Sequence, residues 1–441
     1  MFTDGQLVRL IVPLVVEQLL TVLIGMVDTI MVSSISESAV SAVSLVDNIN
    51  VLLIALFSAM ATGGTVVAAQ YLGKNAWGKA CSAAKQLIYG VMAIAFAAAA
   101  MVTVFCNPLL RLCFGRLPEE TMTFCRTYLS ISAFSYVPLA IYNAGAALLR
   151  AMGNSKASMS VSVLMNVLNV CGNAVLIYGF RLEVAGAALA SLLSHIAGAA
   201  IVIRLLMNSA LPLHLVHLTK LELDGPMLGR IFRIGIPNGL ENSMFQVGKI
   251  LVMGMVSTFS VSTIAANAVS NSIAGFANLI GSAMGLAMLT VVGQCIGAEE
   301  FDQAKYYSRK LLAAIHLCGI AVYALLFFFA RPLAALFNLS EEGMNTAVML
   351  LRWFSAAAVV FWPGSFAVPN ALRAAGDARF TMMVSVFSMW VFRIASSYLL
   401  VYTFKLGILG VWLAMIIDWI FRAACFWLRY CGNRWLQKRV I

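Results

Sequence analysis

Charged side chains are scarce in this sequence and make up only 11% of its 441 residues. Soluble proteins carry about 25% charged residues and about 45–50% apolar ones. Here 62% of the residues are hydrophobic and the mean hydropathy is +0.92. The lack of charge excludes an ordinary soluble domain and indicates a protein that crosses a membrane many times.

Several motifs that would indicate other functions are also missing. The nine cysteines form no CxxC pair and no zinc-ligand spacing, so neither a disulfide framework nor a metal centre is predicted. The sequence has no Walker A motif to hold ATP phosphates and no recognisable nucleophile–base pair. We therefore expect no enzyme, no organic cofactor and no use of ATP within this chain.

The net charge of +11 could suggest binding to nucleic acid. The basic residues, however, lie in small groups between the apolar runs, which does not favour that partner. Cytoplasmic loops of membrane proteins are rich in Lys and Arg. Asp4 and the length of the first apolar run argue against a cleavable signal peptide. These features predict a multi-pass protein of the cytoplasmic membrane, surrounded by lipid, with both termini in the cytoplasm.

Twelve apolar runs are long enough to cross a membrane as helices. The predicted spans are 7–33, 43–71, 86–106, 122–147, 157–180, 184–206, 230–257, 264–294, 311–330, 344–371, 380–404 and 407–430. The longest polar break, 207–229, lies in the middle of the chain. It divides the sequence into an N-terminal six-helix lobe (1–206), a cytoplasmic linker (207–229) and a C-terminal six-helix lobe (230–441).

The two halves of the sequence repeat each other at an offset of 224 residues, or 223 for one pair of segments. The matching segments are 13–17 with 237–241, 70–73 with 294–297, 149–156 with 372–379, and 185–190 with 409–414. Because six spans separate equivalent positions, the halves are parallel repeats. Transporters built in this way bind substrate where the halves meet, although channels can be built from repeats too.

The first span, RLIVPLVVEQLLTVLIGMVDTIMV, contains two acids, Glu17 and Asp28, as well as Pro13. Charged side chains within a membrane are costly and are by default candidates for a functional site. The two acids are eleven residues apart, about three helical turns, so they project from nearly the same face about 16 Å apart.

The sequence resembles the multidrug and toxic compound extrusion (MATE) family over essentially its whole length. The resemblance is carried by the order and spacing of the proline in the first span, DTIMV, QYLG, LRAMGNSK and NVCGNAVLIYGF. It implies an antiporter with two six-helix lobes that alternate between outward and inward openings. Na⁺ or H⁺ would enter while an organic compound, often a cation, leaves.

The resemblance places a cation site at Asp28, with Asn169, Asn173 and Ser191 as its partners. The residues agree with this assignment, because Asn166, Asn169 and Asn173 form a polar stripe along one helix face. A carboxylate with amide and hydroxyl oxygens suits a hard cation such as Na⁺. Many relatives have an aspartate at the position of Asn173, so its absence favours Na⁺ over H⁺. Alternatively, the asparagines only join packed helices.

Glu17 and Glu241 are equivalent in the repeat, and each lies one turn after a proline, Pro13 or Pro237, where a helix can bend. Both are candidates for carrying protons or contacting a cationic substrate. The sequence departs from the family here, since members with an acid in span 10 have it near Trp362 and this chain has none. The alternative is that both glutamates form structural pairs near the cytoplasmic ends of their helices.

Other polar residues within the spans are weaker candidates for substrate contact. Asp47 and Asn50 lie in span 2, and Asn271 and Asn278 lie in span 8. A second group contains charged residues whose role is expected to be structural: Lys249, Arg393, Asp418 and Arg422. Asp418 and Arg422 are four residues apart and can pair within one helix.

The resemblance, together with these residues, implies a cation-coupled antiporter that exports organic, cationic compounds and works as a monomer. A lipid-linked oligosaccharide flippase would need a basic cavity, whereas the spans also contain the acids Glu17, Asp28, Asp47 and Glu241. A channel or receptor is a further alternative. The sequence names neither the natural substrate nor the stoichiometry.

Overall fold

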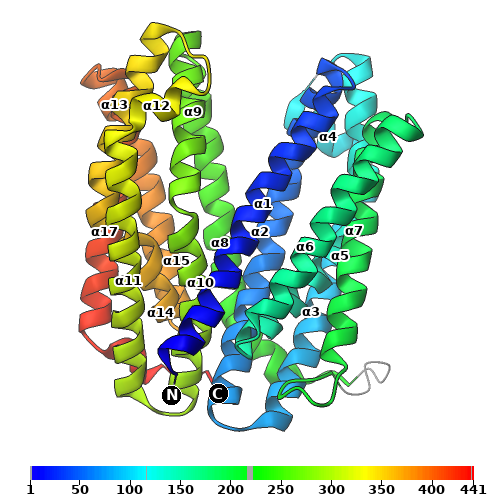
Figure 1. Ribbon diagram of the computed structural model, residues 1–441, viewed down its shortest axis with the longest axis vertical. Coiled ribbons are helices and arrows are strands. Elements are labelled where there is room, and N and C mark those ends of the chain that lie inside the picture. Colours follow the sequence, from blue (N-terminus) through cyan, green and yellow to red (C-terminus); the bar gives the residue numbers. More distant parts are fainter. Residues whose placement is uncertain (1, 116, 216–221, 439) are drawn as a thin grey trace. The chain divides into compact units, whose positions relative to one another are not determined.

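The computed structural model describes residues 2–115, 117–215, 222–438 and 440–441. These residues form helices joined by short turns and contain no strand, as the all-α prediction requires (Figure 1). Residues 216–221 of the predicted linker lie outside the described part. The chain divides into two compact units, Phe2–Gly239 and Leu240–Ile441, called here the N-lobe and the C-lobe.

The boundary between the two units lies inside one helix, α8 (Gly225–Val256), so the lobe limits expected at 206 and 230 stay predictions. The other helices of the N-lobe are α1 (Asp4–Ser33), α2 (Glu37–Gly73), α3 (Trp77–Val104), α4 (Cys106–Phe114), α5 (Glu119–Ala151), α6 (Ser155–Asn173), the π-helical η1 (Ala174–Gly179) and α7 (Glu183–Leu206).

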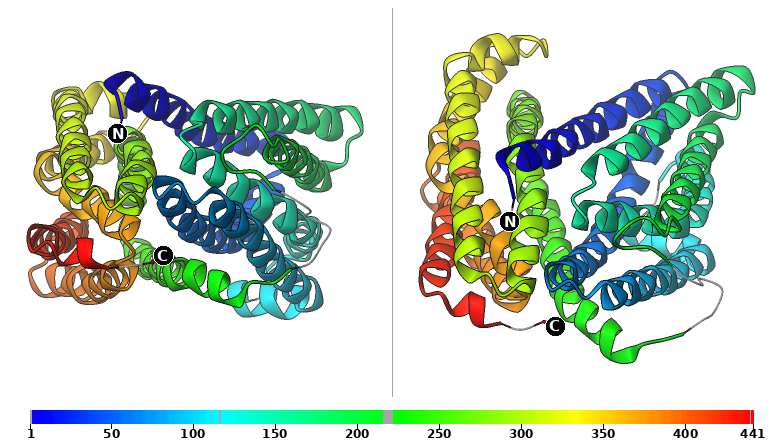
Figure 2. Two further views of the ribbon diagram at one scale, coloured as in Figure 1. Left: turned by 90° about the horizontal axis from the view of Figure 1, so that it is seen from below. Right: turned by 60° about the horizontal axis from the view of Figure 1, so that its bottom comes forward.

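The C-lobe continues with helices that repeat this order. They are α9 (Val261–Ala277), α10 (Leu279–Gly297), α11 (Phe301–Phe328), α12 (Ala330–Ala335), α13 (Glu341–Trp362), η2 (Pro363–Ala367), α14 (Val368–Ala374), α15 (Ala378–Ser388), η3 (Met389–Ala395), α16 (Ser396–Tyr398), η4 (Leu399–Thr403), α17 (Gly407–Cys431) and the short η5 (Arg434–Gln437). Within each lobe the long helices run side by side (Figure 2).

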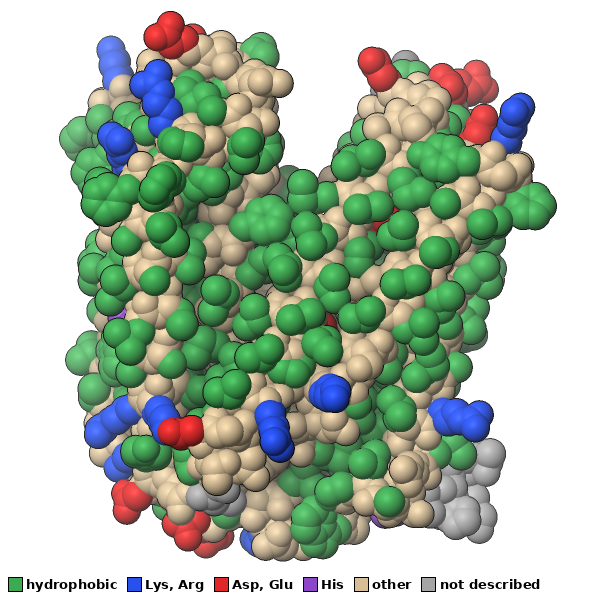
Figure 3. Space-filling model, in the orientation of Figure 1, with side chains coloured by type: hydrophobic (Ala, Val, Ile, Leu, Met, Phe, Trp, Pro, Cys, Tyr) green, Lys and Arg blue, Asp and Glu red, His purple; other side chains and the backbone are tan. Residues whose placement is uncertain are grey.

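Eleven helices of the described chain are long and apolar enough to cross a membrane. The remaining predicted span corresponds to α8, which is interrupted by the polar side chains of Asn238, Glu241 and Lys249. The predicted span 264–294 is broken at Asn278, between α9 and α10. Hydrophobic side chains cover the middle of the helices in each lobe, and charged ones gather at the helix ends (Figure 3).

The internal repeat extends to the conformation of the turns. Gly153 and Gly376, at the same place in the two copies of the LRAMG-type segment, both have positive φ angles of 80° and 96°. Glycine adopts this conformation without a steric penalty. Further equivalent positions with positive φ are Asn75 with Glu299, Gly115 with Asn338, Arg181 with Lys405, and Glu183 with Gly407. The two halves therefore share turns as well as helices, which supports a parallel repeat.

Candidate functional site

The carboxylate of Asp28 lies within the N-lobe beside α6. The side-chain amide of Asn173 donates a hydrogen bond of 2.6 Å to Asp28 Oδ1. Asn173 is only 1% exposed, and Asn169, one turn earlier on α6, is 7% exposed. The structure thus brings together Asp28 from α1 and the two asparagines that the sequence placed with it.

Asn169 connects Asp28 to Ser191 on α7. One amide atom of Asn169 lies 2.7 Å from Asp28 Oδ1, and the other lies 3.0 Å from Ser191 Oγ. The orientation that satisfies both neighbours has the amide nitrogen donating to the carboxylate and the amide oxygen accepting from the serine hydroxyl. All four predicted residues are therefore joined in one network of hydrogen bonds.

The network depends on a close approach of α6 and α7. A Cβ atom at Gly172 would lie 3.0 Å from Cβ of Ala190, so both positions need small side chains. Small residues at helix contacts allow membrane helices to approach closely. Gly172 and Ala190 are neighbours of Asn173 and Ser191 in sequence, and the close approach of α6 and α7 lets Asn169 reach Ser191 at 3.0 Å.

One oxygen of the site remains available. Asn173 Oδ1 is buried and accepts no hydrogen bond from any described residue. A buried acceptor without a partner is costly unless a donor or a cation satisfies it. With the Asp28 carboxylate and the oxygens of Asn169 and Ser191, it supplies the oxygen-rich surroundings that hard cations prefer. The chemistry of these residues fits Na⁺, and Asp28 also offers a protonatable group.

Asp47 forms a second polar group in the N-lobe, between α2 and α5. Asn50 donates to Asp47 Oδ1 at 3.2 Å, and the hydroxyl of Tyr128 lies 3.5 Å from the same oxygen. The hydroxyl of Tyr136 donates to Asn50 Oδ1 at 2.9 Å. The sequence prediction missed both tyrosines of α5, of which Tyr128 contacts Asp47 and Tyr136 contacts Asn50.

Glu17 and Glu241 do not join the Asp28 network, because each forms an ion pair with an arginine. Arg150 lies 2.9 Å from Glu17, and Ser158 donates to its other oxygen at 3.0 Å. Arg373 lies 2.7 Å from Glu241. Both arginines occupy the repeated LRAMG-type segment, which was the sequence signal that could have identified them.

Pro13 and Pro237 both lie inside continuous helices, α1 and α8, so the predicted bends at these positions stay a prediction. Two asparagines predicted for substrate contact in the C-lobe bind other residues. Asn271 donates to the backbone oxygen of Asn267 at 2.9 Å, within α9. Asn278 accepts a hydrogen bond of 2.7 Å from Tyr323.

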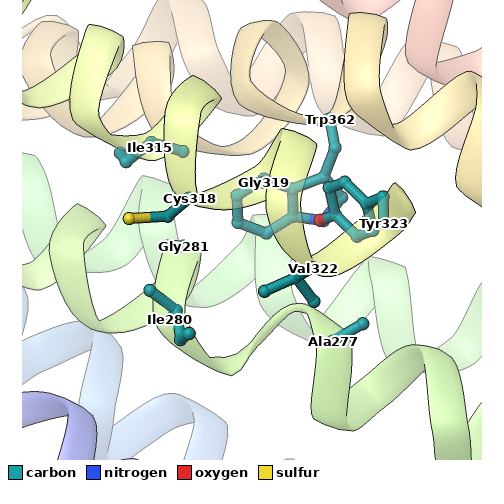
Figure 4. A pocket seen from close by; sticks show the side chains of 9 residues that line it. All are labelled: Ala277, Ile280, Gly281, Ile315, Cys318, Gly319, Val322, Tyr323 and Trp362. Atoms are coloured by element: carbon teal, nitrogen blue, oxygen red, sulfur yellow. The ribbon is translucent and has the colours of Figure 1, made fainter. Parts of the chain in front are cut away.

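Tyr323 also lines a pocket of the C-lobe together with Trp362 and Gly281 (Figure 4). None of the side chains that line this pocket is a carboxylate or an amine. A Cβ atom at Gly281 would lie 2.3 Å from the Trp362 ring, so the indole packs directly on this glycine. The pocket is therefore lined mainly by apolar and aromatic side chains.

The charged residues of α17 differ from the sequence expectation. Asp418 and Arg422 do not pair with each other among the described contacts. Asp418 lies 3.8 Å from Arg393, while Arg422 lies 3.9 Å from Glu241. Both residues point toward neighbouring helices whose charges could not be located from spacing along one helix. The C-lobe thus contains a connected group of charges in its interior.

Comparison with known proteins agrees with this architecture. The family model MatE matches residues 13–175 and 237–399, two stretches with the same offset of 224 as the repeat. The uncharacterized transporter YisQ of Bacillus subtilis is 28% identical, and the alignment covers 97% of this chain and 94% of the relative. A probable multidrug resistance protein NorM of Thermotoga maritima is 24% identical, with 99% and 94% covered.

Solved structures show the same fold at lower sequence identity. A chain described as the outward-facing conformation of a multidrug resistance MATE family transporter of the MOP superfamily is 20% identical and has a TM-score of 0.91. The alignment covers 98% of this chain and 96% of that chain. A structure of MATE in the bent conformation is 19% identical, covers 99% and 96%, and also has a TM-score of 0.91.

Proposed function

Because the chain belongs to the MatE family, the multidrug and toxic compound extrusion transporters, and is therefore not an enzyme, we propose that it is a cation-driven antiporter. It exports organic compounds while Na⁺ or H⁺ enters. The relatives named as multidrug resistance proteins support drugs as the exported class. The proposal places it in the cytoplasmic membrane, with both termini in the cytoplasm, working as a monomer.

The observation that carries this proposal is the network around Asp28. The Asp28 carboxylate lies 2.6 Å and 2.7 Å from the amides of Asn173 and Asn169, and Asn169 lies 3.0 Å from the Ser191 hydroxyl. Asn173 Oδ1 has no partner among the described residues. Burying a carboxylate within a membrane is costly, and the binding of an ion offsets that cost. Asn173 is an amide and not an acid, which favours Na⁺ over H⁺ as the coupling ion.

Coupling requires that the cation bind the outward-open and inward-open states with different affinity. The mechanism that we propose is competition. Asp28 and Asp47 both lie in the N-lobe, where either carboxylate suits a positive charge, which is the coupling ion or a cationic group of the substrate. A cation that occupies Asp28 from outside displaces such a substrate, and the loaded lobe then returns to the inward-open state.

The test measures ethidium efflux from cells under two conditions, one with an inward Na⁺ gradient and one with an inward H⁺ gradient. Asp28→Asn is expected to reduce gradient-dependent efflux to the level of cells without the protein, while the amount in the membrane is unchanged. Asp302→Asn, which removes an exposed acid at the start of α11, serves as the matched control and should leave efflux intact. Normal ion-dependent efflux in Asp28→Asn would overturn the proposal.

A further inference from the structure

Three basic side chains surround one aromatic ring inside the C-lobe. The cationic groups of Lys249, Arg393 and Arg422 lie 5.1, 5.4 and 6.0 Å from the centre of the Phe245 ring. They come from three different helical segments, α8, η3 and α17. Cations favour the face of an aromatic ring, but one ring does not neutralise three charges.

Carboxylates neutralise only part of this group. Arg422 and Arg373 share Glu241, at 3.9 and 2.7 Å. Arg393 lies 3.8 Å from Asp418, whose carboxylate also accepts a hydrogen bond from Ser388. Lys249 has no ion-pair partner among the described residues. With Arg373 included, four cations face two acids, which leaves this group with a net charge of about +2 at neutral pH.

The location of Lys249 makes the excess charge accessible. Its side chain is exposed, although it lies in the second half of α8, next to the apolar segment Ile250–Val256. A lysine within a membrane-spanning helix faces a water-filled cavity or the bundle interior, because lipid does not solvate the charge. Gly248 brings α8 close to η3, since a Cβ atom there would lie 2.2 Å from Cε of Met389.

The repeat relates this basic group to the cation site of the N-lobe. At the offset of 224 residues Asp28 corresponds to Val252 and Ser191 to Met415. Asn169 and Asn173 lie where the offset changes from 223 to 224, opposite the C-lobe segment 392–397, which contains Arg393. The acid of the N-lobe has been replaced by an apolar residue, and the segment opposite its amides contains an arginine. Lys249 lies one turn before Val252 on the same helix.

Arg393 also lies in a π-helical turn whose counterpart in the N-lobe is part of the regular helix α6. The offset changes from 223 at Gly153 and Gly376 to 224 at Arg181 and Lys405, so the C-lobe contains one extra residue between these turns. The segment includes η3 (Met389–Ala395), a π-helical turn that contains Arg393. Such turns accommodate single inserted residues and are frequent at functional sites.

We propose that Lys249 and Arg393 form an anion-binding site, which holds the carboxylate, sulfonate or phosphate group of an exported organic compound. The inference rests on the proposed export function and adds a second class of substrate group to the cations expected at Asp28 and Asp47. Arginine and lysine donate charge-assisted hydrogen bonds to such groups. The Phe245 ring beside both side chains offers contact to an aromatic or apolar body of the same compound.

Binding of carboxyfluorescein, an aromatic carboxylate, to the purified full-length protein tests this site directly. Lys249→Gln is expected to weaken binding at least about tenfold, the effect of losing one charge-assisted contact, and Lys249→Arg should retain it. Lys249 has no acid partner to leave unpaired, so the variant should fold, which its thermal unfolding verifies. Arg331→Gln, at an exposed position in α12, is the matched control.

Two results would overturn the assignment. One is that the wild-type protein does not bind carboxyfluorescein detectably, or that Lys249→Gln and Arg393→Gln bind it as tightly as wild type does. The other is complete displacement of the probe by phosphatidylglycerol, which would identify a lipid headgroup as the ligand. Efflux of ethidium separates this proposal from the proposed function. If Lys249→Gln still exports ethidium in a gradient-dependent way, the proposed antiporter function stands, even if the anion site is disproved.

Discussion

In the N-lobe, Asp28 lies beside two asparagine amides, one of which bonds to Ser191. The C-lobe has Val252 and Met415 at the positions of Asp28 and Ser191, and Arg393 in the segment opposite the asparagines. The two lobes nevertheless share their turns with positive φ and a glutamate–arginine pair, as each of Glu17 and Glu241 binds an arginine from the LRAMG-type segment. The repeat has retained the contacts that hold its helices together. It differs where an ion or a substrate would bind.

The retained ion pairs offer the largest expected effect on stability. Arg150→Met leaves Glu17 without its cationic partner, and breaking a buried pair costs about 3–5 kcal/mol. Arg373→Met should cost less, because Arg422 stays 3.9 Å from Glu241. Thermal unfolding of the purified variants measures the difference.

The double variant Glu17→Gln with Arg150→Met is the control for that comparison and should recover most of the lost stability. Equal losses from Arg150→Met and Arg373→Met would contradict the stated role of Arg422. A double variant as unstable as the single one would show that Arg150 stabilises the lobe by some contact other than Glu17.

Asn173→Asp would make the cation site more acidic and so sharpen the contrast between the lobes. The new carboxylate would lie at the place of an amide that is 2.6 Å from Asp28. Two carboxylates that close do not both ionise, so one of them carries a proton. We expect ethidium efflux to gain a dependence on the pH gradient, measured with and without Na⁺.

A variant that keeps its Na⁺ dependence and gains no response to the pH gradient would contradict this interpretation of Asn173. Asn50→Asp, which adds a carboxylate beside Asp47 and not beside Asp28, controls for a general effect of negative charge in the N-lobe.

Ser191→Ala should have the smallest effect, since it removes one neutral hydroxyl from the network. A hydrogen bond of this kind contributes about 1 kcal/mol, which corresponds to about fivefold weaker apparent affinity for the coupling ion. The dependence of efflux on ion concentration gives this value. Ser194→Ala is the control, because the Ser194 hydroxyl donates to the backbone oxygen of Ser191 in its own helix. An equal effect of both substitutions would remove Ser191 from the site.

Much of this architecture could be predicted because it depends on patterns among residues that are close in the sequence. Apolar runs located the spans, and the spacing of Asn169 and Asn173 on one face of α6 located the residues beside Asp28. Contacts between distant segments could not be predicted in this way. Arg150 and Glu17 are 133 residues apart in the sequence, and Lys85 and Glu222 are 137 residues apart. No helical period relates residues with such separations.

The same limit applies to charge. From the sequence, the four acids within the spans argued against the anionic cargo of a flippase, but the sequence could not show which of them are neutralised. In the structure Glu17 and Glu241 are paired with arginines, and Asp418 pairs with Arg393 instead of with Arg422, its neighbour on α17. The charge that matters at each site depends on which partners the fold brings together, and only the packed helices determine that.

The claim that the two lobes carry oppositely charged sites is tested most directly by measuring both ligands on the same purified variants. Binding of the coupling ion and of carboxyfluorescein is compared in wild type, Asp28→Asn and Lys249→Gln. The account predicts that Asp28→Asn loses the ion and keeps the dye, while Lys249→Gln loses the dye and keeps the ion. Loss of both ligands in either variant, or of neither ligand in both, would contradict it.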